Sequence, residues 1–255
     1  MRQMRLIGLA VLAAACAVTL AASAGAATVR VGKLVLQADG SFEPRALPKR
    51  TFAPIRFQGY GKIRKTDGTV PPALQHVKVD YDRDGRLTTA GLPVCAPGKL
   101  ADATPRQARN RCRSAIVGTG QIAAVVPLPL LGKIEMRSPL TLFNGPHRDG
   151  NPTALLHAQA PFPIAETYVV VVPIERRRGA YRYRTEFDVP PIAGGLGAIT
   201  RISAKVGRSY RAGGKSRSYI SARCSDYILQ TKGYFSFADG NVVYGSVFKP
   251  CTIRR

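Results

Sequence analysis

Arginine, lysine and tyrosine residues gather in two stretches whose side chains are suited to binding anions. The basic residues are Arg176, Arg177, Arg178, Arg182 and Arg184 in the first stretch and Arg208, Arg211, Lys215 and Arg217 in the second. Guanidinium groups bind phosphate and carboxylate oxygens through paired hydrogen bonds. Both stretches are therefore candidate contacts for an anionic envelope polymer or anionic lipid head groups. The alternative is an ordinary solvated surface.

The first basic stretch also alternates in a way that predicts its orientation in a strand. Tyr181 and Tyr183 share one side of an extended chain, because successive side chains of a strand point to opposite faces. Arg182 and Arg184 share the other side. We expect the tyrosines to face the core and the arginines to face outward.

The run Asp80-Tyr81-Asp82-Arg83-Asp84-Gly85 matches the first half of a calcium-binding loop. Carboxylates at alternate positions and a glycine at the bend are what a hard cation requires. The match ends there, because Gly91 stands where a bidentate glutamate is needed and the flanking arginines oppose a cation. Asp80, Asp82 and Asp84 are thus weak metal candidates. A hairpin closed by Asp84-Gly85 is the favoured interpretation, and a calcium-stabilised extracellular module is an alternative function.

The histidines do not fall into a recognised catalytic pattern. The sequence lacks the G-x-S-x-G turn of α/β-hydrolases and the H-E-x-x-H helix of zinc hydrolases. No catalytic residue is therefore assigned, and no cofactor is expected. A secreted hydrolase with a dispersed active site is the alternative, and it requires a pocket where His147 or His157 meets an acid and a hydroxyl.

The first 26 residues have the organisation of a secretory signal peptide. Two arginines precede an apolar, alanine-rich run, and Ala24-Gly25-Ala26 provides a cleavage site after Ala26. Cys16 offers a minor alternative, a lipid anchor attached at that residue. The protein is thus expected to be secreted or extracytoplasmic, and intracellular nucleic acid is not an expected partner.

The charge of the chain favours anionic partners. The sequence has 38 Lys and Arg against 15 Asp and Glu, a formal net charge of +23. Arg2 and Arg5 leave with the signal peptide, so the mature chain keeps a charge of +21. Such a field attracts polyanions and anionic membranes. A coding bias towards arginine would produce the same balance.

Four cysteines follow the signal peptide, and an even count in an exported chain predicts disulfide bonds. We expect neighbours in sequence to pair, Cys95 with Cys112 and Cys224 with Cys251. The alternative is a zinc site made of all four thiolates. The sequence lacks the C-x2-C spacing typical of such a site.

The pattern of hydrophobic residues predicts an all-β fold, an antiparallel β-sandwich or jelly roll. Strands are expected at 29–37, 55–63, 74–81, 86–89, 114–126, 138–143, 154–160, 167–174, 180–189, 198–206, 218–223, 228–237 and 242–248. Pro and Gly separate nearly all of them, and a turn is expected at Asp39-Gly40 after the first strand. One short helix is expected near 104–112, because Thr104 and Gln107 suit a capping box and Pro105 suits the first helical position. We expect 27–92 to be an N-terminal β-extension of the same domain and 93–255 to be a disulfide-framed sandwich.

The C-terminal hairpin yields a specific prediction. With Asp239-Gly240 as a two-residue turn, Phe235 faces Tyr244, and Cys251 falls too far from Cys224 for a bond across one hairpin. We therefore expect the ladder to break near Asp226. On this register Phe235, Phe237 and Phe248 face the core.

Several short motifs resemble those that recur in uncharacterised exported proteins of high-GC Gram-positive bacteria. They include the stretches 117–120, 142–145, 155–158, 190–195, 218–224 and 235–240. The resemblance spans roughly Cys95 to Cys251 and implies an exported β protein with this cysteine frame. It implies no activity. The leading hypothesis is a non-enzymatic exported protein that associates with the cell envelope or an anionic extracellular polymer.

Overall fold

The structure is a computed structural model that describes residues 26–161 and 165–254. Apart from Ala26, the expected signal peptide lies outside the described residues, and so does Cys16.

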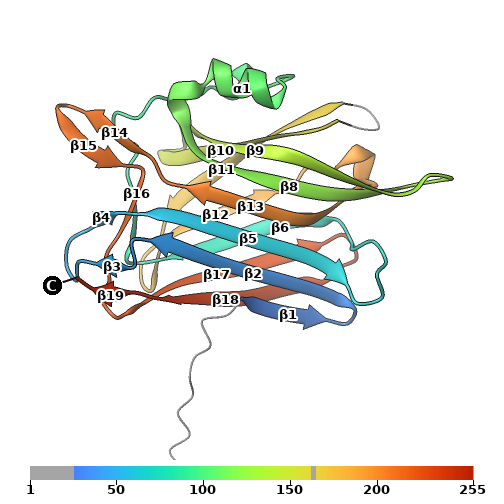
Figure 1. Cartoon of the computed structure of the whole chain (residues 1–255), viewed down its shortest axis with the longest axis horizontal. Helices are drawn as coiled ribbons and strands as arrows, with labels where there is room; N and C mark the ends of the chain where they lie inside the picture. Colours follow the sequence, from blue (N-terminus) through green and yellow to red (C-terminus); the bar gives the residue numbers. More distant parts are fainter. Residues whose placement is uncertain (1–25, 162–164, 255) are drawn as a thin grey trace, which may run out of the picture.

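A single twelve-stranded sheet forms most of the molecule (Figure 1), and every strand pair within it is antiparallel. In order across the sheet, its strands are β1 (Ala27–Val31), β2 (Leu34–Glu43), β5 (Arg56–Lys65), β13 (Ala198–Val206), β8 (Ile116–Leu128), β9 (Gly132–Arg148), β10 (Asn151–Ala160), β11 (Glu166–Arg176), β12 (Tyr181–Asp188), β6 (Leu74–Asp82), β17 (Ile228–Phe237) and β18 (Val242–Pro250).

Shorter elements lie around this sheet. They are the three-stranded set β4 (Ala53–Pro54), β16 (Ile220–Ala222) and β7 (Gly85–Leu87), the hairpin β14 (Ser209–Ala212) and β15 (Lys215–Ser218), the parallel pair β3 (Ala46–Leu47) and β19 (Thr252–Ile253), the helix α1 (Pro105–Arg111) and the 3-10 turns η1 (Pro97–Lys99), η2 (Arg113–Ala115) and η3 (Ala193–Gly195).

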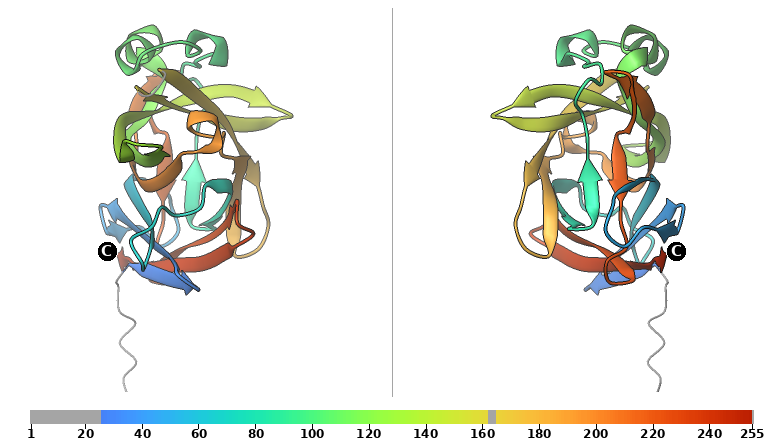
Figure 2. Two further views of the ribbon diagram at one scale, coloured as in Figure 1. Left: turned by 90° about the vertical axis from the view of Figure 1, so that its right-hand side faces the viewer. Right: turned by 90° about the vertical axis from the view of Figure 1, so that its left-hand side faces the viewer.

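The large sheet curls until its two edge strands meet. β1 and β18 stand at opposite ends of the strand order, yet a Cβ placed on Gly245 of β18 would lie 3.1 Å from Val29 Cγ2 of β1. Figure 2 shows the sheet wrapped around a common interior. The all-β class with one short α-helix is therefore confirmed. The two layers expected of a sandwich belong to one nearly closed sheet.

Apolar side chains alternate towards the interior of this nearly closed sheet, as the strand period requires. Two clusters gather towards opposite ends of the tube. One contains Leu34, Leu36, Ile63, Ile199, Phe237 and Val243, and the other contains Phe42, Leu47, Ala222, Cys224 and Cys251. These clusters pack the two ends and leave the middle of the tube between them.

The N-terminal and C-terminal parts of the chain share the sheet. β5 pairs with β13, and β6 lies between β12 and β17. Of the strands from residues 27–92 in the large sheet, β1, β2 and β5 lie together at one end of the strand order, and β6 lies between later strands.

Two turns differ from the sequence-based expectations at the start of the sheet. The single strand expected at 29–37 is two strands, β1 and β2, because Gly32 has φ +56° and turns the chain there. The turn expected at Asp39-Gly40 is instead part of β2, where Gly40 lies against the ring of Phe57.

The helix and the first disulfide cover the outer face of β9 and β10. Thr104 caps α1 and forms the expected capping box with Gln107. The Cys95–Cys112 bond is confirmed, and both cysteines pack with Leu100, Phe143 and Leu155 in one cluster.

The second disulfide, Cys224–Cys251, is also confirmed. The break expected in the strand ladder near Asp226 is confirmed as well. β16 ends at Ala222, β17 begins at Ile228, and Tyr227 between them has φ +67°. The bond therefore joins the end of the sheet to a segment outside the β17–β18 ladder.

The expected register of β17 and β18 is wrong by one residue. Phe235 pairs with Val243, because residues 238–240 form a three-residue loop in which Gly240 has φ +81°. Phe235 and Phe237 still face the interior. The shift turns Phe248 to the outside, where its side chain is 53% exposed, so its expected core position is wrong.

Replacing Cys224 and Cys251 together by serine is expected to lower the free energy of unfolding by about 3–4 kcal/mol, because the bond restricts the unfolded chain. Denaturant titration of the oxidised protein and of the double variant measures this difference. Equal unfolding midpoints and slopes would contradict the stabilising role.

Candidate ligand-binding cavity and basic surface

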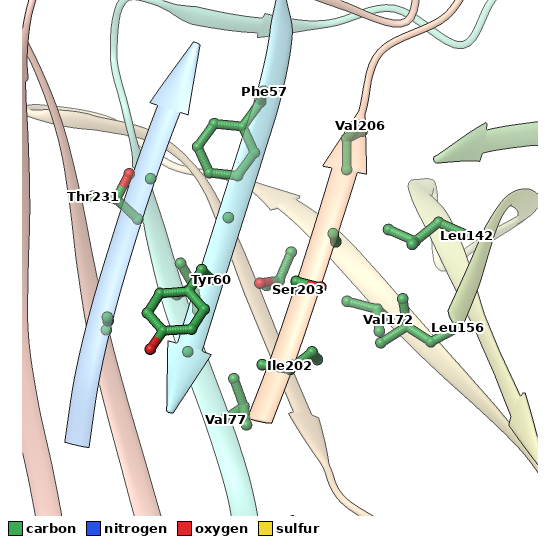
Figure 3. A pocket seen from close by; sticks show the side chains of 18 of the residues that line it. Phe57, Tyr60, Val77, Leu142, Leu156, Val172, Ile202, Ser203, Val206 and Thr231 are labelled. Carbon is green, nitrogen blue, oxygen red and sulfur yellow. The ribbon is translucent and has the colours of Figure 1, made fainter. Parts of the chain in front are cut away.

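An apolar cavity occupies the middle of the tube. Its volume is about 590 Å³, and residues from all twelve strands of the large sheet line it. Figure 3 shows Leu142, Leu156 and Val172 on one side of it and Phe57 and Ile202 on another. Eight strands make an interior that side chains can fill, and wider closed sheets enclose free space. The cavity therefore follows from the number of strands.

The wall of the cavity is uneven in side-chain size. The strands β9, β10 and β11 contribute large apolar side chains, which are Leu140, Leu142, Leu156, Val170 and Val172. The strands β1, β2, β5, β17 and β18 contribute many small residues, including Ala27, Ala38, Gly40, Gly59, Gly61, Gly233 and Gly245. Neighbouring side chains lie against several of these glycines, such as Phe57 against Gly40 and Gly59 and Phe235 against Gly233.

Burial favours the neutral phenol of two tyrosines on this wall. It raises the pKa of the Tyr81 phenol, and burial together with the neighbouring Tyr81 raises the pKa of Tyr219. Five charged residues border the cavity, namely Asp39, Asp82, Arg86, Arg137 and Lys249. Arg86 and Arg137 are exposed, whereas the Lys249 side chain is only 15% exposed.

The three aspartates of the calcium-like run accept hydrogen bonds from the protein at all six carboxylate oxygens. Arg184 binds both oxygens of Asp80, at 2.8 and 2.9 Å. Asp82 accepts hydrogen bonds from two backbone amides. Asp84 accepts hydrogen bonds from Arg223 Nε and from one backbone amide, both at 2.7 Å. This geometry favours the hairpin interpretation over a calcium loop.

Neighbouring aspartates have opposite pKa shifts. Burial raises the pKa of Asp82, and its two backbone hydrogen bonds only partly oppose that effect. Burial also acts on Asp84, but hydrogen bonds from Ser225 and the Arg223 guanidinium outweigh it and hold the pKa of Asp84 below its usual value. Asp84 is therefore a stable anion that anchors the segment after β16.

The orientation expected for the Tyr–Arg stretch holds for Tyr183 and Arg184, whereas the β12–β6 register shifts between Tyr181 and Tyr183 and Tyr181 does not line the cavity. Tyr183 is buried and lines the cavity, while Arg184 pairs with Asp80 on the outside. Arg176, Arg177 and Arg178 are exposed at the β11–β12 turn.

Sequence reasoning missed a basic cluster that includes one of the candidate arginines. The guanidinium carbons of Arg86, Arg182 and Arg223 lie 5.5, 5.2 and 5.3 Å from the centre of the Phe52 ring. We call these four residues the Phe52 cluster. They come from four separate parts of the chain, so no local sequence motif marks them. Arg182 also donates a hydrogen bond to the carbonyl oxygen of Arg83. The backbone amide of Arg83 in turn donates to the carbonyl oxygen of Ala180 in the β11–β12 turn. These bonds connect the cluster to the turn that carries the exposed arginines.

The second basic stretch forms a separate surface. Arg211, Lys215 and Arg217 lie on the β14–β15 hairpin, whose turn has positive φ at Gly213 and Gly214. Arg208 donates to the Ile116 carbonyl at 2.7 Å, which ties it to β8.

The histidines lie away from the cavity wall. Buried His157 faces the α1 side, where its Nε2 donates to the Ala103 carbonyl at 2.8 Å. His147 is exposed beside Thr89. His76 contacts the carboxylates of Glu186 and Asp188 on the outer face. These contacts do not gather a histidine, an acid and a hydroxyl in the cavity.

Protonation of His157 is expected to destabilise the fold in acid. Burial lowers its pKa below 6.5, so the unfolded chain takes up this proton at a higher pH than the folded chain. Stability therefore falls as the pH drops through about 6.5, by at most about 1.4 kcal/mol per pH unit. Denaturant titrations between pH 7.5 and pH 5 should show a smaller loss in His157→Gln than in the unmodified protein.

A matched control for this measurement is His147→Gln, because His147 is exposed. This variant should keep the pH dependence of the unmodified protein. The same pH dependence in all three proteins would show that His157 does not carry the effect.

No helix in the described part of the chain is long and apolar enough to cross a bilayer. Within residues 26–161 and 165–254, no three His, Cys, Asp or Glu side chains come together as a metal site requires. Comparisons of the chain with protein-family models, with curated proteins and with solved structures find no match.

Proposed function

We propose that this protein is a non-enzymatic extracytoplasmic protein that binds an apolar or amphiphilic small molecule inside its nearly closed sheet. The observation that carries the proposal is the apolar cavity of about 590 Å³. This volume falls within the range typical of small-molecule sites, roughly 300–1,000 Å³. A hydrocarbon chain in a space of this volume gains packing contacts with the apolar wall.

The compartment is part of the proposal. Two disulfides are typical of an oxidising environment outside the cytoplasm. Export by the signal peptide of residues 1–26 accounts for that environment, with a lipid anchor at Cys16 as the alternative route to the envelope. A carrier of apolar molecules has a role there, because such molecules dissolve poorly in water.

Thr231→Trp is expected to weaken binding of a neutral apolar dye such as Nile red. Thr231 lines the cavity from β17, and a larger ring there takes up part of the free volume. Each methylene group of a ligand contributes about 0.8 kcal/mol on burial, so excluding two of them weakens binding by roughly tenfold. Fluorescence titration gives the dissociation constant.

The matched control is Lys232→Trp, because Lys232 is the next residue of β17 and is exposed on the outer face. It should bind the dye as the unmodified protein does. Equal affinities for the two tryptophan variants, or no dye binding by the unmodified protein, would contradict the cavity as the ligand site.

A second candidate function is association with an anionic envelope polymer or anionic lipid surface. The observation that favours it is the Phe52 cluster, together with the exposed arginines of the β11–β12 turn. Stacking on the Phe52 ring holds Arg86 and Arg182 in place without neutralising them, whereas Arg223 is paired with Asp84. This function does not exclude the first, since a carrier in the envelope benefits from a surface that retains it there.

Replacing Arg176, Arg177 and Arg178 together by serine is expected to lower the salt concentration that elutes the protein from a heparin-like matrix. The three side chains are exposed, so their charges act on a polyanion directly. Retention by anionic vesicles should fall in the same way.

The control removes three exposed arginines beside the helix, Arg106, Arg109 and Arg113, and so makes the same change in net charge. It should elute close to the unmodified protein. Equal shifts in both triple variants would show that only the total charge matters and that the turn is not a binding surface.

A further inference from the structure

Three tyrosines of the cavity wall come together beside the short strand β7. They are Tyr81 of β6, Tyr183 of β12 and Tyr219, which lies between β15 and β16. The backbone amide of Leu87 in β7 donates to the hydroxyl oxygen of Tyr183 at 3.3 Å. The amide of the next residue, Thr88, donates to the carbonyl oxygen of Tyr219 at 2.9 Å. Adjacent residues of one segment therefore hold two of these tyrosines.

The three tyrosines also share apolar neighbours. Tyr183 and Tyr219 belong to separate buried clusters, and Leu87 and Leu156 pack against both of them. Tyr81 is the ladder partner of Tyr183 and packs against the same cluster. Figure 3 shows Leu156 in the wall of the cavity. The three phenol rings thus border one region of the interior.

The hydroxyl groups of the two buried tyrosines are not fully used within the fold. Tyr219 is only 3% exposed, yet its hydroxyl has no hydrogen-bond partner among residues 26–161 and 165–254. In the same part of the chain, the Tyr183 hydroxyl accepts from Leu87 but finds no acceptor for its own proton. Burial raises the pKa of Tyr219, so this phenol keeps its proton. A buried donor without an acceptor is unfavourable, and an oxygen atom of a ligand would satisfy it.

The surroundings favour a neutral ligand over an ionised one. The cations that border the cavity already have partners, which are Phe52 for Arg86, Glu135 for Arg137 and, among others, Asp39 for Lys249. An ionised head group inside the tube would lose its hydration and would have to displace one of these partners. A neutral oxygen acceptor needs only a donor.

We propose that the cavity ligand is a neutral lipophile with a carbonyl oxygen, such as an ester or a quinone, and that the phenol of Tyr219 donates a hydrogen bond to this oxygen. The inference rests on the proposed ligand-binding function and names its ligand class. Tyr183 lies beside Tyr219 as a second donor, and a carbonyl oxygen has two lone pairs to accept with. The hydrocarbon part of the ligand packs against the large apolar side chains of β9, β10 and β11.

The test compares three compounds as competitors of Nile red, namely methyl decanoate, dodecane and decanoate. Dodecane has the length of methyl decanoate but lacks the carbonyl group. Tyr219→Phe should weaken binding of methyl decanoate about five- to tenfold, because one hydrogen bond is lost, and should leave dodecane unchanged. The unmodified protein should bind decanoate, which is ionised at pH 8, more weakly than the ester.

The matched control is Tyr244→Phe, because Tyr244 is 68% exposed on β18 and does not line the cavity. It should bind all three compounds as the unmodified protein does. Without ligand, Tyr219→Phe should unfold at no lower a denaturant concentration than the unmodified protein, since it removes no hydrogen bond of the fold. A lower unfolding midpoint would show that the hydroxyl serves the fold and would overturn its role as a ligand donor.

The remaining outcomes separate this inference from the cavity function. Methyl decanoate unaffected by Tyr219→Phe, or weakened together with dodecane, would overturn the carbonyl site and leave the apolar cavity in place. Decanoate bound more tightly than the ester would overturn the neutral ligand class. Failure of all three compounds and of Nile red to bind would overturn the cavity function itself. A loss confined to the ester would support the site.

Discussion

Closure of the twelve-stranded sheet is the constraint on which the rest of the structure depends. Antiparallel strands with one apolar face must bury that face, and here the sheet does so by curling until β1 meets β18. Twelve strands set a circumference wider than side chains can fill. The end clusters, the uneven wall and the free space between them are consequences of that width.

The closure of the sheet also explains where the disulfide bonds and the apolar clusters lie. A sheet that curls leaves two ends and one seam to be sealed. The second disulfide and the cluster around Leu47 seal one end, and the cluster around Phe237 seals the other. The first disulfide instead holds the α1 segment over the outer face of β10. Among the described residues no strand ladder joins β1 to β18, and side chains make contact across the seam between these two edge strands.

Sequence patterns predicted the local features well, because each depends on neighbours in the chain. The all-β class, the Thr104 capping box, both disulfides and the break near Asp226 followed from strand period, turn residues and cysteine spacing. The errors also have local causes. Gly32 and Gly240 have positive φ, and each changed a strand boundary or a register that was read from alternation alone.

The cavity and the Phe52 cluster were beyond prediction from the sequence. Alternation shows that one face of each strand is apolar, but it does not show how many strands close into one ring. A sandwich and a tube have the same pattern of inward residues. Arg86, Arg182 and Arg223 lie far apart in the chain and meet only because β16 passes beside β7 and β6 pairs with β12. Only the tertiary arrangement makes such a cluster visible.

The position of β6 between β12 and β17 affects the order in which the strands can pair during folding. β6 pairs with strands that lie about a hundred residues or more further along the chain. Contacts of such long range form slowly. β17 and β18 join the large sheet through β6, so the ring is incomplete until β17 has paired with β6. On the proposed route of export, the chain builds its apolar chamber outside the cytoplasm. The molecules present at that stage are the first that the chamber can enclose.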